Sequence, residues 1–167
     1  MDNQSFREEL TRGARLLGRG KARQAQAIFE RLSKARPDDL AVAINLGGAY
    51  ILNQQFARAI PVLEAVVKRE PCDPMVWTNL GAAFLGNPVL ATAEQQDKAI
   101  AAFERALDCD PVAPHVAYNL GLIYRDRNDR DRAIHWFTRA VQANPLDGDA
   151  RRSLSRLRAL GEGERRI

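Results

Sequence analysis

Apolar residues recur three and four positions apart along almost the whole chain, a spacing that places them on one face of a helix. Segments that begin Asn-Leu-Gly occur at residues 45–50, 79–84 and 119–124. Four further stretches share a small residue followed by a large apolar one: Ala25 and Phe29, Ala59 and Leu63, Ala99 and Phe103, and Ala133 and Phe137. The pattern predicts paired helices and no strands.

Four prolines divide the pattern into units. Pro37, Pro71, Pro111 and Pro145 are separated by 34, 40 and 34 residues, so the third unit carries six extra residues. A proline cannot continue the preceding helix but suits the first turn of the next one, so it ends each unit. Glycine and alanine at the crossing would let two antiparallel helices approach closely. Because one helical hairpin cannot bury its apolar stripe alone, the hairpins are expected to stack.

The third unit resembles the tetratricopeptide-repeat (TPR) pattern position by position, apart from its six extra residues. The second and fourth units match nearly as well, and the first is degenerate. The matching residues of the third unit are Trp77, Leu80, Gly81, Phe84, Ala99, Phe103, Ala106 and Pro111, and the first unit keeps Gly13, Ala25, Phe29 and Pro37.

The resemblance implies an all-α fold, a right-handed superhelical α-solenoid of four TPR helical hairpins plus a C-terminal capping helix. We expect a single TPR domain over residues 1–167, with repeats at about 6–38, 39–72, 73–112 and 113–146 and a cap at about 147–161. In the cap, Asp147 and its neighbours offer N-cap residues, and an apolar seam follows. Gly161 is expected to end this helix, and residues 162–167 are expected to fray. The seam consists of Leu154, Leu157 and Leu160.

The six extra residues fall between the two helices of the third repeat and allow two interpretations. Asn87 and Pro88 fit an N-cap and first helical position, so the second helix could begin there. Alternatively, the segment is an extended loop and the helix begins at Thr92, which has a glutamine three residues later, as in a capping box. Val89 and Leu90 need a packing partner, and we favour the neighbouring hairpin over a bound protein.

In the TPR family, first helices line a concave groove that binds peptides. A ladder of asparagines on that face could bond the backbone of an extended peptide, because each amide offers a donor and an acceptor. The alternative is that each asparagine braces its own helix or the next repeat. Apolar and small neighbours on the same face favour a ligand with hydrophobic anchors. The predicted peptide-binding residues are Asn45, Asn79, Asn119, Met75, Thr78, Tyr118, Leu122, Gly48 and Ala82.

Some TPR co-chaperones hold a C-terminal carboxylate with basic residues on this face. The corresponding positions here are Leu10, Ala14, Met75 and Asn79, so only the asparagine is shared. An acidic chaperone tail is therefore not expected as the ligand.

Few residues suggest chemistry. Cys72 and Cys109 are interpreted as small buried residues next to repeat junctions, in a reduced cytoplasmic protein. His115 and His135 fall in different helices without metal-ligand spacing. We expect no enzyme activity, cofactor or metal, and no membrane span, because charges interrupt every apolar run well before roughly 18 residues.

The leading hypothesis is a protein–protein interaction module that binds an extended, partly apolar peptide in the groove. Self-association through the apolar strip or the thinly capped ends is the alternative. Nucleic-acid binding through the arginine-rich C-terminal helix is less favoured, since the net charge is only +4.

Overall fold

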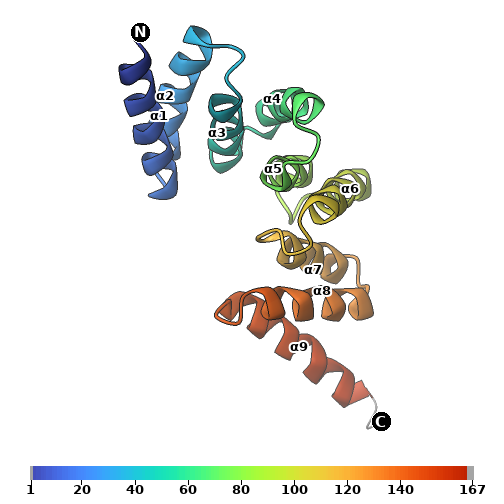
Figure 1. Cartoon of the computed structure of the whole chain (residues 1–167). Helices are drawn as coiled ribbons and strands as arrows, with labels where there is room; N and C mark the ends of the chain where they lie inside the picture. Colours follow the sequence, from blue (N-terminus) through green and yellow to red (C-terminus); the bar gives the residue numbers. More distant parts are fainter. Residues whose placement is uncertain (1, 165–167) are drawn as a thin grey trace.

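The computed structural model describes residues 2–164 and the side chains of residues 2–159. Every regular element in this part of the chain is an α-helix, and consecutive helices pack against each other from one end of the chain to the other. Figure 1 shows the resulting curved stack, with the two termini at opposite ends. The helices are α1 (Asn3–Gly18), α2 (Ala22–Ala35), α3 (Leu40–Leu52), α4 (Phe56–Arg69), α5 (Pro74–Leu85), α6 (Ala93–Cys109), α7 (Val116–Asp126), α8 (Arg130–Ala143) and α9 (Gly148–Glu164).

A buried glycine lies where the two helices of each hairpin cross. A Cβ atom built on any of these glycines would lie 2.6–2.8 Å from a side chain of the partner helix, closer than real Cβ contacts. The predicted close approach is therefore confirmed in all four repeats, including the degenerate first one. The pairs are Gly13 with Phe29, Gly47 with Leu63, Gly81 with Phe103, and Gly121 with Phe137.

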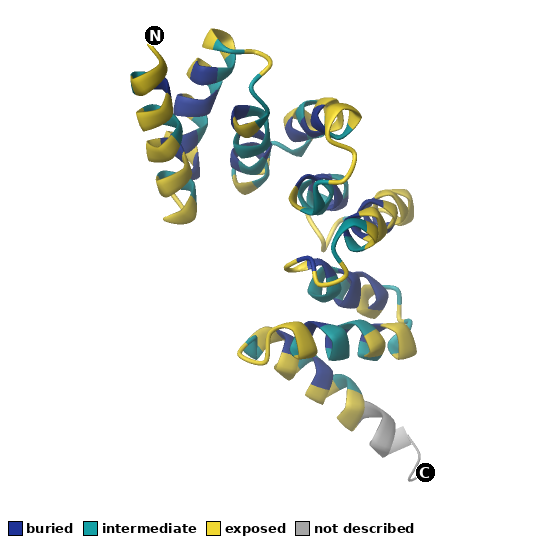
Figure 2. Cartoon of the chain, viewed as in Figure 1, coloured by how far each residue is buried: buried dark blue, intermediate teal, exposed yellow. Residues whose placement is uncertain are grey.

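The apolar core extends along the solenoid in two parts. Two clusters of buried residues, one in each half of the chain, share the partly buried Trp77 and Phe84 as neighbours. Figure 2 shows the buried residues on the sides where helices face one another, with exposed residues on the outer turns. Each hairpin thus buries its stripe against the next one, as stacking requires.

The tight turns between paired helices use a residue in the left-handed conformation. Gly20, Gln54 and Asn128 occupy the same place in the first, second and fourth hairpins and have φ values of 72°, 58° and 58°. In the third hairpin the turn is replaced by the insertion, and the chain leaves α5 through Gly86 at a φ of 63°.

The insertion is an extended loop, and α6 begins after Thr92. The Thr92 hydroxyl accepts a hydrogen bond from the Gln95 amide at 3.2 Å, and the Gln95 side chain accepts one from the Thr92 amide at 2.9 Å. This reciprocal pair confirms the capping-box interpretation and excludes a helix start at Asn87.

The expectation that Val89 and Leu90 pack on the neighbouring hairpin is wrong. Val89 is 89% exposed and Leu90 is 76% exposed. The loop satisfies its own backbone, because the Val89 amide donates to Asn87 Oδ1 and the Leu90 amide donates to the Asn87 carbonyl, both at 3.0 Å. These contacts hold the turn without burying either side chain.

The C-terminal helix α9 packs against α8 as a cap. Asp147 Oδ1 accepts hydrogen bonds from the amides of Asp149 and Ala150, and Leu154 is buried. The prediction that Gly161 ends the helix is wrong, because α9 continues to Glu164. A glycine inside a helix costs only about 1 kcal/mol relative to alanine, so it does not by itself stop one. The Leu160 side chain and the last three residues of the predicted frayed end lie outside the described part.

The two cysteines are also different from the prediction. Cys72 and Cys109 form a disulfide with their Cα atoms 5.3 Å apart, and Cys72 lies in an exposed turn. They are therefore neither free nor deeply buried. Both lie at the base of the third hairpin, where the start of α5 meets the end of α6.

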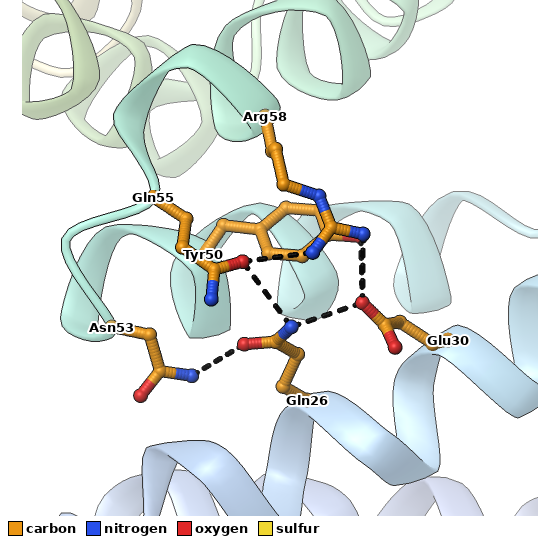
Figure 3. A network of polar contacts seen from close by, with 6 residues as sticks. All are labelled: Gln26, Glu30, Tyr50, Asn53, Gln55 and Arg58. Atoms are coloured by element: carbon orange, nitrogen blue, oxygen red, sulfur yellow. Dashed lines mark hydrogen bonds and ion pairs between the residues drawn. The ribbon is translucent and has the colours of Figure 1, made fainter.

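The junction between the first two hairpins contains a polar network (Figure 3). Glu30 of α2 accepts hydrogen bonds from Gln26 at 2.9 Å, from the Tyr50 hydroxyl at 3.1 Å and from the Arg58 guanidinium at 2.9 Å. The Gln26 bond, with smaller contributions from Tyr50 and Arg58, holds the pKa of Glu30 below its ordinary value. Burial, and then the neighbouring Glu30, raises the pKa of Tyr50. The network joins α2 to α3 and α4.

Candidate peptide-binding groove

Three first helices, α1, α3 and α5, line a small, open apolar hollow of about 300 Å³. Four of the predicted site residues meet there, namely Asn45, Gly48, Met75 and Asn79. We call this hollow the N-terminal groove. Its complete lining is Leu17, Ile44, Asn45, Gly48, Ile51, Leu52, Met75 and Asn79.

The N-terminal groove exposes large apolar side chains. Leu52 and Met75 are each 57% exposed, although both are among the residues that normally seek burial. A Cβ on Gly48 would lie 3.6 Å from Leu17 Cδ2, an ordinary contact, so Gly48 leaves open space in the floor. An apolar hollow with adaptable methionine and leucine walls suits a hydrophobic side chain of a ligand.

The asparagines of the predicted ladder are not equivalent. Asn45 donates one N–H of its side-chain amide to the Ala41 carbonyl of its own helix at 2.8 Å, which agrees with the bracing interpretation and leaves its second N–H and its oxygen available. Among the described contacts, Asn79 and Asn119 make no side-chain hydrogen bond, and both are half-buried. Of these two, only Asn79 lines the N-terminal groove.

The remaining predicted residues lie elsewhere on the solenoid. Tyr118 packs edge-on against Phe137, with 5.7 Å between ring centroids, and lines a separate hollow of about 270 Å³ that includes Asp147. Burial raises the pKa of Tyr118, and Asp149 and Asp147 add to this effect. This tyrosine therefore packs on α8 and lies near the start of the capping helix.

Three further predicted residues do not line the N-terminal groove. Thr78 uses its hydroxyl to donate to the Pro74 carbonyl of its own helix at 2.7 Å. Ala82 and Leu122 are half-buried on α5 and α7. A continuous ladder would need all three asparagines on one surface, and the N-terminal groove contains only two of them, Asn45 and Asn79.

Leu17 is a groove residue that the sequence reasoning missed. It lies one 34-residue period before Ile51, another lining residue, so the repeat register itself could have identified it. The degenerate first repeat hides this equivalence, because its first helix lacks the Asn-Leu-Gly landmark.

A larger and more open hollow of about 900 Å³ lies at the hairpin edge, beside the insertion. Phe56, Phe84 and Leu90 contribute apolar surface to it, and Arg58 and Lys98 contribute charge. Arg58 is paired with Glu30 and Lys98 with Glu94, at 2.9 and 2.7 Å respectively.

The groups that could carry chemistry are dispersed. His115 is exposed at the start of α7, while the His135 ring packs edge-on against Trp136 with 5.2 Å between centroids. Across the described residues, no three histidine, cysteine, aspartate or glutamate side chains lie close enough together to hold a metal ion. Within the same part, no helix is both long and apolar enough to cross a membrane.

Comparison with known proteins agrees with the repeat geometry. One tetratricopeptide-repeat family model matches residues 16–82, and a second matches residues 52–114, 88–148 and 118–163. The chain belongs to the tetratricopeptide-repeat family. A search of curated proteins found no match.

Solved structures of other proteins superpose on most of this TPR protein. MamA from Desulfovibrio magneticus RS-1, residues 41 to its end, is 27% identical, with a TM-score of 0.70 over 86% of this chain and 77% of that chain. A thermophilic TPR protein of Thermus thermophilus has a TM-score of 0.79 at 21% identity, over 91% of this chain and 80% of that one. At that identity the second likeness concerns the fold alone.

Proposed function

We propose that this TPR protein is a non-enzymatic adaptor or scaffold that binds an extended, partly apolar segment of a partner protein in the N-terminal groove. Membership of a family of protein-interaction modules supports the general role. The observation that carries the specific proposal is the exposure of Leu52 and Met75 around a hollow that also presents the unengaged Asn79 amide. Together they offer one apolar pocket and one backbone-type hydrogen-bonding group.

The ligand is expected to place a hydrophobic side chain in the hollow and a peptide group against Asn79. The groove lining contains no charged residue, so an acidic or basic anchor would gain nothing there. A cytoplasmic location stays a prediction, and the Cys72–Cys109 pair removes the cysteine argument that favoured it.

The proposal is tested with peptides selected from a random library against the whole chain. Met75→Lys puts a charge at the hollow and should weaken binding more than tenfold, about 1.4 kcal/mol or more. Asn79→Ala removes one hydrogen-bonding group and should weaken binding roughly 3- to 10-fold. Dissociation constants from fluorescence anisotropy provide the comparison.

A matched control places the same charge outside the groove. Ala101 is exposed on α6, near Trp136 of α8, so Ala101→Lys should leave binding unchanged. Peptides that bind Met75→Lys as well as wild type, or a library that yields no groove-dependent peptide, would refute the proposal. Light scattering of the free protein over a concentration series addresses self-association, which a monomer at all concentrations excludes.

A further inference from the structure

At the base of the second, third and fourth hairpins, the same two positions of the repeat carry different chemistry. One position directly follows a junction proline, and the other stands two residues before the next junction proline. In the second repeat these positions are Asp38 and Arg69. The Arg69 guanidinium donates to the backbone carbonyl of Asp38 at 2.9 Å and lies 4.0 Å from the Asp38 carboxylate. In the third repeat they are Cys72 and Cys109, joined as a disulfide.

The fourth repeat has a third pair of residue types at these positions. There the two positions are Val112 and Ala143, which line the same two hollows at the hairpin base. Val112 is 67% exposed, so the apolar pair of the fourth repeat does not close the hairpin base, and the second repeat closes it with a polar contact alone. It follows that the scaffold itself does not require a disulfide at this place.

The third hairpin also has strong packing that is independent of its disulfide. Gly81 and Phe103 meet at the helix crossing, and Leu80 and Phe103 are almost fully buried. Asp73 caps α5 by accepting from the Met75 and Val76 amides at 2.8 and 3.2 Å. Opening the disulfide leaves all of these contacts in place.

One of the two residues joined by the disulfide is exposed. Cys72 lies in the exposed turn between α4 and α5, and Cys109 is half-buried at the last position of α6. Thiol–disulfide exchange requires a thiolate to reach one sulfur, so exposure of the Cys72 side favours attack there.

We propose that Cys72 and Cys109 form a reversible redox site that exchanges with low-molecular-weight monothiols such as glutathione. The thiolate attacks Cys72 Sγ, a mixed disulfide forms, and Cys109 Sγ leaves as a thiolate that takes up a proton. A second monothiol attacks the outer sulfur of the mixed disulfide, releasing Cys72 as a thiol and forming the oxidised monothiol. Two electrons pass from the two monothiols to the protein, and the oxidised monothiol reverses the reaction.

The consequence is a change in the constraint on α5, the helix that carries Met75 and Asn79. The disulfide fixes the start of α5 to the end of α6, whereas the reduced hairpin is held at this end by packing alone. The inference stands whether or not the N-terminal groove binds a peptide, because both its readouts concern the free protein.

Trp77 provides a local reporter of the redox state. Its indole donates to the Pro71 carbonyl at 2.8 Å, and Cys109 Sγ lies 4.0 Å from the same oxygen. A disulfide quenches indole emission at short range more strongly than a thiol pair does. The chain has two tryptophans, so Trp136→Phe leaves Trp77 as the single emitter.

The experiment titrates the full chain carrying Trp136→Phe in millimolar glutathione buffers of varied thiol-to-disulfide ratio. We expect Trp77 emission to rise on reduction and to return on oxidation, with two thiols becoming reactive to maleimide and with an unchanged far-UV spectrum. The same protein with Cys72→Ser and Cys109→Ser should give no response. A disulfide that resists reduction until the protein unfolds, or thiols that do not rejoin, would overturn the proposal.

A second variant transplants the closure of the second repeat. The double variant Cys72→Asp/Cys109→Arg should fold and should have a melting temperature close to that of the reduced wild type. Its stability should not depend on the glutathione buffer. The oxidised wild type should melt roughly 5–15 °C higher than either, since a cross-link restricts the unfolded chain. Amide exchange of residues 72–79 should be faster in the reduced protein. A transplant that fails to fold while the reduced wild type also unfolds would assign the disulfide an obligatory structural role and overturn the proposal.

Discussion

Adjacent glycines in α3 allow the packing at a helix crossing to be measured within one helix turn. Gly47 faces Leu63 of α4, and an added Cβ would lie 2.6 Å from Leu63 Cδ2 and 2.7 Å from Leu63 Cγ. Gly48 faces the N-terminal groove, where an added Cβ would lie 3.6 Å from Leu17 Cδ2. The variants Gly47→Ala and Gly48→Ala therefore differ in packing and share the same helix.

The expected magnitudes follow from two opposing effects. Replacing a glycine inside a helix by alanine gains about 0.5–1 kcal/mol, because alanine loses less backbone freedom on folding. Gly48→Ala should keep that gain. Leu63 is fully buried and its Cγ, close to the backbone, is one of the clashing atoms, so Gly47→Ala adds an overpacking cost of about 1–3 kcal/mol. The gain cancels between the variants, which leaves Gly47→Ala less stable by about 1–3 kcal/mol.

Urea denaturation followed by far-UV circular dichroism measures this difference, with thermal melting as a second readout. At about 2–4 °C per kcal/mol for a chain of this size, the two melting temperatures should differ by roughly 2–12 °C. Equal stability of the two variants would refute the reasoning, since it would mean that the α3–α4 crossing is looser than its geometry indicates. An unchanged m-value ensures that the same surface unfolds in both.

Two further predictions concern individual polar contacts. Thr92→Ala removes the capping box of α6 and should lower the free energy of unfolding by about 1 kcal/mol, whereas Thr92→Ser should keep most of that stability. Equal destabilisation by the two substitutions in urea denaturation would contradict the role of the Thr92 hydroxyl as a cap. Glu30 has a lowered pKa in the folded protein, so its charged form stabilises the fold above its ordinary value of 4.5, and that contribution is lost as the pH falls through the folded pKa. Wild type should therefore lose its advantage over Glu30→Gln below about pH 4.5 in thermal melts taken across a pH series, and a constant difference would disprove the linkage.

The features that follow from local rules could be predicted from the sequence. The crossing glycines recur once in every repeat because only a residue without a side chain fits there, so both Gly13 and Gly121 stand out. The start of α6 depends on Thr92 and Gln95, two residues within one turn, so the local sequence is enough to predict where this helix begins. Such features need no knowledge of how distant segments meet.

The cysteine pairing could not be predicted in this way. Cys72 and Cys109 are separated by 37 residues, and neither has neighbours that indicate a partner. They meet only because a hairpin brings its two ends together, and their alignment with Asp38 and Arg69 becomes visible once that geometry is known. The loop carrying Val89 is a similar case, because its apolar sequence suggested burial, whereas the turn at Asn87 leaves the Val89 side chain exposed.

The asparagine ladder illustrates what periodicity leaves open. Asn79 and Asn119 occupy the same position of successive repeats, yet a continuous ladder also requires successive first helices to lie side by side. In the described structure α3 packs against both α1 and α5, whereas α5 and α7 have no comparable contact. The insertion lies between α5 and α6, within the third repeat. Asn45 uses one amide N–H within its own helix, whereas Asn79 makes no side-chain hydrogen bond among the described contacts and lines the groove, so Asn79→Ala is the sharper test of a peptide contact by the ladder.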